Sequence, residues 1–148
     1  MSDQIIGQIL AMAIRTVHRG PMLEVADAMA EVGGSFGADY GSSADRGITF
    51  ISARQWQEVR EALGADLPWH TRRANVLVDA DGLLDLVGRT IQVGQVQVAI
   101  KAQTNPCSQM DRLHPGLRAA LQPEGRAGVY GRIVRGGQIQ VGDPVTVV

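Results

Sequence analysis

The stretch from Thr90 to Ile100 reads Thr-Ile-Gln-Val-Gly-Gln-Val-Gln-Val-Ala-Ile, two strand-like segments on either side of Gly94-Gln95. Val and Ile favour β-strands, and a glycine between two such segments accepts the positive φ of a tight turn. The stretch therefore predicts a β-hairpin.

Other apolar or β-branched runs predict further strands along the chain. They lie at 5–14, 48–51, 74–78 and 145–148, and a second hairpin is expected at 129–141 around the paired Gly136 and Gly137. Glycine is abundant at 18 residues and aromatic residues make up only 4%, which suits a protein of tight turns more than a helical bundle. These strands predict a mainly β fold, a β-barrel or strongly curved sheet.

One clear helix is expected directly after the strand at 48–51. Ser52 is the predicted N-cap, Gln55 the reciprocal capping residue, and Gly64 the C-terminal stop. Trp56, Val59 and Leu63 recur at spacings of three and four and so share one face. Shorter helical pieces are expected within 23–31 and at 108–112, giving a barrel with a few short helices.

Length and composition restrict the class of protein. A chain of 148 residues with 45% hydrophobic residues matches one domain, 1–148, with its own core. The net charge of -1 predicts no general attraction to nucleic acid or to a membrane surface. No apolar run approaches the roughly 20 residues that span a bilayer, and the N-terminus lacks a signal-peptide pattern, so a cytoplasmic protein is expected.

The single cysteine, Cys107, is the first candidate for chemistry. One cysteine excludes an internal disulfide, a CxxC redox pair and a cysteine-rich zinc site. Pro106 precedes it, and Ser108 is expected to cap a short helix whose positive end would favour thiolate over thiol. A thiolate suits a metal ligand or a sulfur nucleophile; the alternative is that Cys107 is a small buried hydrophobe.

A second candidate is the segment Trp69-His-Thr-Arg-Arg-Ala-Asn75, which precedes a predicted strand. Arg72 and Arg73 offer forked donors for a phosphate or carboxylate, and Asn75 adds a neutral donor and acceptor. An anionic ligand is one interpretation. The other interpretation is that both arginines are solvated side chains at the entrance to a strand.

The ordered combination of motifs resembles the MOSC domain family over nearly the whole chain. The matching segments are Gly7-Gln-Ile9, Arg19-Gly-Pro-Met22, the Phe36 to Gly41 loop with Asp39, Arg46-Gly-Ile-Thr-Phe-Ile-Ser52, Arg72-Arg-Ala-Asn75, Leu86-Val-Gly-Arg89, Val93-Gly94 and Pro106-Cys107. One departure is that Ala38-Asp39-Tyr40 stands where the family commonly has Gly-Asp-Arg.

The resemblance implies a β-barrel similar to the barrel domain of pyruvate kinase, and a site for the molybdenum cofactor. It implies that Cys107 is the metal ligand or carries sulfur, and that Arg72, Arg73, Asn75 and Asp39 contact the pterin cofactor. We expect these five residues to converge on one pocket. No pyridoxal phosphate site is expected, so a separate protein would have to donate sulfur. A redox role would instead need an electron-donor protein.

Three functions stay open, in this order of preference. The first is a molybdenum enzyme that reduces N-hydroxylated compounds with electrons from a partner. The second is a non-enzymatic carrier of the cofactor, or of a persulfide on Cys107. The third is an inactive interaction domain, and the sequence leaves the oligomeric state undetermined.

Overall fold

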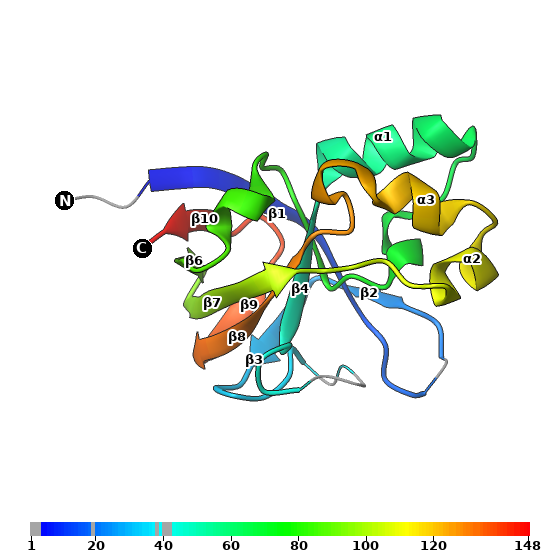
Figure 1. Ribbon diagram of the computed structural model, residues 1–148. Coiled ribbons are helices and arrows are strands. Elements are labelled where there is room, and N and C mark those ends of the chain that lie inside the picture. The colour runs from blue at the N-terminus through cyan, green and yellow to red at the C-terminus, as the bar shows by residue number, and fades with distance from the viewer. Residues whose placement is uncertain (1–3, 19, 38, 40–42) are drawn as a thin grey trace.

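The computed structural model describes residues 4–18, 20–37, 39 and 43–148, and its main feature is a closed β-barrel (Figure 1). Seven strands run in the order β10-β6-β7-β8-β4-β5-β1, and β1 pairs with β10 to close the ring. Their bounds are β1 Gln4–Ile14, β4 Ile48–Ser52, β5 Val76–Val78, β6 Thr90–Val93, β7 Val96–Gln103, β8 Val129–Arg135 and β10 Pro144–Val147. Six of these pairings are antiparallel, and β4–β5 is parallel.

Three shorter strands extend the barrel. The strand β2, Leu23–Val25, pairs with the second half of β1, while β3, Asp27–Ala30, and β9, Gly137–Gln140, form a separate two-stranded sheet. The mainly β prediction, the barrel and the 90–100 hairpin, which forms as β6–β7, are confirmed.

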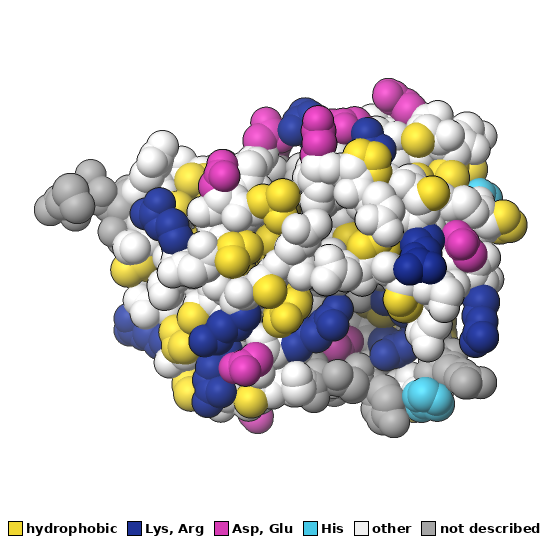
Figure 2. Space-filling view, in the orientation of Figure 1, with side chains coloured by type: hydrophobic (Ala, Val, Ile, Leu, Met, Phe, Trp, Pro, Cys, Tyr) yellow, Lys and Arg dark blue, Asp and Glu magenta, His cyan; other side chains and the backbone are white. Residues whose placement is uncertain are grey.

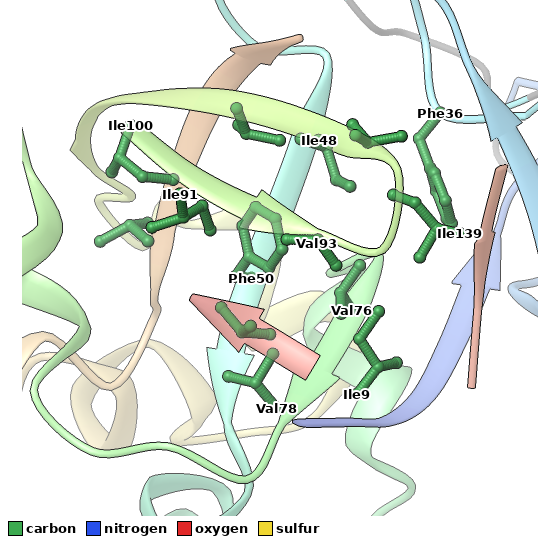
Figure 3. Packing of buried hydrophobic residues seen from close by; sticks show 14 of the residues in the cluster. Ile9, Phe36, Ile48, Phe50, Val76, Val78, Ile91, Val93, Ile100 and Ile139 are labelled. Atoms are coloured by element: carbon green, nitrogen blue, oxygen red, sulfur yellow. The ribbon is translucent and has the colours of Figure 1, made fainter. Parts of the chain in front are cut away.

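The barrel interior is apolar because alternate residues of each strand point inward. Figure 3 shows Ile9, Phe50, Val76, Ile91 and Ile139 converging there from different strands. Every residue of β4 is buried, since its inward side chains fill the barrel and its outward Ile51 joins a second apolar cluster under the helices.

Helices cover that outer face of β4. They are α1 Ala53–Leu63, α2 Gln109–Leu113 and α3 Leu117–Leu121, with the 3-10 turns η1 Trp69–Arg72, η2 Leu83–Leu86 and η3 Pro123–Gly125. The Ser52 hydroxyl accepts from the Gln55 backbone N–H at 3.3 Å and Gly64 ends α1 at φ 60°, both as predicted. The Gln55 side chain does not bond back to Ser52; it donates to the Glu124 carbonyl at 2.7 Å, because η3 packs against this end of α1.

Two further expectations are wrong. Residues 23–31 form the strands β2 and β3 in place of a helical turn, because their backbone groups pair with β1 and β9. The second hairpin does not form, because β9 leaves β8 and pairs with β3 instead. Gly136 permits this, since a Cβ there would lie 2.8 Å from the Ala30 carbonyl oxygen.

No helix in the described part of the chain is long and apolar enough to cross a membrane.

Candidate functional site

Cys107 lies in the segment between β7 and α2 and is exposed. This contradicts the alternative that it is a buried hydrophobe. Its carbonyl accepts the Met110 backbone N–H at 3.0 Å and so begins the first turn of α2. Ser108 makes no side-chain capping bond and has helical backbone angles, so its predicted capping role is wrong.

Arg72 ends η1 and is buried, with 5% of its surface exposed. Its Nε donates to the Ala127 carbonyl at 3.1 Å, whereas its Nη2 has no hydrogen-bond partner among the described residues. Burial, and then the charge of Arg46, lower the pKa of Arg72 to about 10, a value that already includes a smaller opposing effect of Cys107. Arg72 is therefore a buried cation, not a solvated arginine.

Arg73 takes the left-handed backbone conformation, at φ 67°, and this turns it toward a different part of the chain from Arg72. Its Nη1 donates to the Gly20 carbonyl at 3.1 Å. Burial, and then the charge of Arg15, lower the pKa of Arg73. It lines a hollow of about 150 Å³ with Met22, His70, Thr71 and Leu113.

The turn η1, which carries Arg72, contacts α2. Cys107 precedes α2, and the hollow at Arg73 includes Leu113, the last residue of this helix. A helix of five residues is roughly 8 Å long, so a thiol and a second cationic pocket lie within reach of one elongated ligand.

Asn75 is buried and joins three strands of the barrel wall. Its Oδ1 accepts the Thr49 backbone N–H at 3.0 Å, and its Nδ2 donates to the Ala13 carbonyl at 3.3 Å. The Asn75 backbone also bonds to Thr49 and Ala13. Its amide is thus used within the wall and positions the exit from η1.

Asp39 contacts the backbone of Arg15. Its Oδ1 accepts the Arg15 backbone N–H at 2.9 Å, which connects the loop before β4 to the end of β1. Its neighbours Ala38 and Tyr40, where the sequence departs from the family pattern, lie outside the described residues. The turn η1, which ends at Arg72, contacts α2, which begins shortly after Cys107, and Asp39 is hydrogen-bonded to the backbone of Arg15, whose charge acts on Arg73.

Two residues near this site were not predicted. Arg46 is exposed, lies with its guanidinium carbon 4.8 Å from the centre of the Tyr130 ring, and acts on Arg72. Thr104 is 2% exposed, and its hydroxyl has no hydrogen-bond partner within the described ranges. Arg46 stood in a motif of the resemblance, whereas nothing in the sequence around Thr104 indicates its burial.

Basic side chains dominate the part of the surface below the helices. On the face in Figure 2, most acidic side chains follow the upper edge over α1, and most lysine and arginine side chains lie below it. Among the residues that the structure describes, no group of three or more His, Cys, Asp or Glu side chains is placed to hold a metal ion.

The described chain is thus a closed barrel with short helices on one side and an exposed cysteine before α2. The MOSC domain model matches residues 15–146, and the chain belongs to the MOSC domain family. No curated protein matches the sequence.

Solved structures share the fold at low sequence identity. The chain is similar to YuaD from Bacillus subtilis, with a TM-score of 0.82 and 17% identity over 99% of this chain and 98% of that one. It is also similar to YiiM from Geobacillus stearothermophilus, with a TM-score of 0.71, 20% identity and coverage of 99% and 75%. YiiM from Escherichia coli gives a TM-score of 0.73 at 12% identity, with 95% and 69% covered.

Proposed function

We propose that this protein binds the molybdenum cofactor, with the Cys107 thiolate as metal ligand and Arg72 and Arg73 as anion contacts. The observation that carries the proposal is the exposed thiol beside a buried arginine whose Nη2 has no partner in the described chain. A buried cation of this kind is costly unless an anion compensates it. Family membership supports the same cofactor.

The residues present fit such a group. A thiolate is a soft ligand suited to a heavy transition metal, and a guanidinium fork binds oxyanions. When bound, the cofactor would supply a redox-active metal that reduces an N-hydroxylated substrate with electrons from a partner protein. We place this activity in the cytoplasm as part of the same proposal.

The chain's own residues divide the work by position. Cys107 holds the metal end, Arg72 offsets negative charge next to it, and Arg73 meets the phosphate end in the hollow beside Leu113. Asn75 fixes the end of η1, so that both arginines are held by the barrel wall. Asp39 holds the Arg15 segment against this region.

A sulfur carrier is the second candidate, because the chain's single thiol is exposed. In that role the Cys107 thiolate attacks the terminal sulfur of a donor persulfide and becomes a persulfide, and the donor leaves as a thiolate. The carrier needs Cys107 but does not need Arg73.

The test combines molybdenum analysis of the purified protein with mass spectrometry of Cys107. We expect the wild type to carry molybdenum and Cys107→Ser to lose it while still folding, because a hydroxyl is a hard, rarely ionised ligand. Arg73→Ala should weaken cofactor capture by about ten- to a hundredfold, the loss of roughly 1.5–3 kcal/mol for a charge-assisted hydrogen bond. Arg118→Ala, an exposed arginine of α3, is the matched control and should load normally.

Other outcomes reassign the function. A persulfide on Cys107 with no molybdenum, equal in wild type and Arg73→Ala, would identify a carrier. If the protein carries neither molybdenum nor a persulfide, and Cys107→Ser changes the result of no assay, the protein is an interaction domain.

A further inference from the structure

Two buried polar groups next to the turn before β8 have no partner in the described chain, and a folded protein rarely leaves such groups without a reason. One is the Arg72 Nη2 and the other is the Thr104 hydroxyl, on side chains of residues that are 5% and 2% exposed. Each forgoes hydrogen bonds that water would have supplied in the unfolded chain.

Arg72 and Thr104 are hydrogen-bonded to consecutive residues of the turn that precedes β8. The Arg72 Nε donates to the Ala127 carbonyl at 3.1 Å, and the Thr104 backbone N–H donates to the Gly128 carbonyl at 2.8 Å. Gly128 adopts φ 88°, and a Cβ there would lie 2.0 Å from the Phe50 carbonyl oxygen. The turn therefore packs directly on β4, and it holds both residues rigidly.

The position of Cys107 completes the arrangement. It follows Thr104 by three residues, and α2, which begins shortly after it, contacts η1, which ends at Arg72. In the described part of the chain Arg72 forms no salt bridge with a carboxylate, and the charge of Arg46 opposes its own. A guanidinium N–H and a hydroxyl O–H, both able to donate, suit a compact negative ligand.

We propose that Arg72 and Thr104 form an oxyanion subsite beside Cys107, which binds a tetrahedral oxyanion such as molybdate or sulfate. The proposal deepens the proposed function and rests on it for the placement of the cofactor's metal end here. Thr104 is then a residue that recognises oxygen atoms around the group bound at Cys107, and its buried hydroxyl is stabilised only when that group is present.

The experiment uses molybdate and sulfate as probes and the single cysteine as the reporter. Each anion is titrated while the rate of Cys107 alkylation by neutral iodoacetamide is followed by mass spectrometry, and the melting temperature is measured without anion. The variants are Thr104→Val, which replaces the hydroxyl by a methyl group of similar size, and Thr104→Ser, which keeps the hydroxyl. Thr146→Val, in β10, is the matched control.

We expect both anions to slow alkylation in the wild type, in Thr104→Ser and in Thr146→Val. In Thr104→Val the anion affinity should fall at least tenfold, while the melting temperature of the anion-free protein rises, because an unsatisfied buried group has been removed. A hydroxyl with a purely structural role would give the opposite shift in melting temperature.

Unchanged anion affinity in Thr104→Val, or a lower melting temperature, would overturn the subsite. These results are separate from those for the proposed function. Normal molybdenum loading with an anion-insensitive Thr104 leaves the function standing without the subsite, whereas anion binding that needs Thr104, in a protein that never acquires the cofactor, leaves the subsite without the function.

Discussion

Asn75 and Arg72 are buried polar residues of the same short segment, yet the fold treats them differently. Asn75 is 4% exposed, and its side chain hydrogen-bonds two strands of the barrel wall. Arg72 is 5% exposed, and its Nε is hydrogen-bonded whereas its Nη2 has no partner in the described chain. The barrel wall is thus fully hydrogen-bonded at Asn75. The corner formed by Arg72 and Thr104 keeps hydrogen-bond donors that have no acceptor in the described chain.

This difference separates buried polar groups that stabilise the fold from buried polar groups that are available to bind a ligand. A buried polar group with all of its bonds made stabilises one arrangement of the backbone, whereas one with unused donors costs stability until something binds it. The comparison predicts that substitutions in the wall reduce stability, and that substitutions in the corner affect binding more than folding.

The largest effect is expected for Asn75→Ala. The change leaves the Thr49 N–H and the Ala13 carbonyl without their side-chain partner, at about 1–3 kcal/mol for each, so the free energy of unfolding should fall by about 2–6 kcal/mol. Chemical denaturation measures the fall, with exposed Asn105→Ala as the control that changes little. A loss below about 1 kcal/mol would show that the hydrogen bonds of the Asn75 side chain do little to stabilise the barrel wall.

The sequence predicts the wall better than the corner. Alternating apolar residues and the glycine turn at Gly94 predict the β6–β7 hairpin, because both signals are local. The pairing of β9 is not predictable in this way, because alternation around Ile139 indicates which face is buried but not which strand is the partner.

In the corner, the sequence singles out Cys107 and Arg72 as candidates because their residue types suit metal and anion binding. Thr104 is not, because its burial depends on contact with Gly128, far along the chain. Likewise the roles of Asn75 and Asp39 as backbone partners depend on which strands and loops meet. Residue type thus predicts chemistry, and tertiary contact decides whether a residue serves binding or structure.

Two helix ends sharpen the comparison. Gly64 ends α1 and Arg73 ends η1 in nearly the same left-handed conformation, at φ 60° and 67°. A residue with a Cβ costs about 1–2 kcal/mol there, and only the end near the candidate site carries this strain. We expect Arg73→Gly to unfold with a free energy about 1 kcal/mol higher than Arg73→Ala, and Gly64→Ala to lose about 1 kcal/mol. Equal stability of the two Arg73 variants would show that this backbone is not strained.

The smallest effects are expected at the two serines that precede helices. The Ser52 hydroxyl caps α1 from a fully buried position, so Ser52→Ala should lower the free energy of unfolding by about 1 kcal/mol. Ser108 is exposed and makes no cap bond, so Ser108→Ala should change stability by less than about 0.5 kcal/mol. The pair is measured by denaturation under one set of conditions, with cofactor loading of Ser108→Ala as a second measurement. If Ser108→Ala cost as much as Ser52→Ala, then α2 would be capped in solution after all, and the segment that carries Cys107 would be bonded as firmly as the wall.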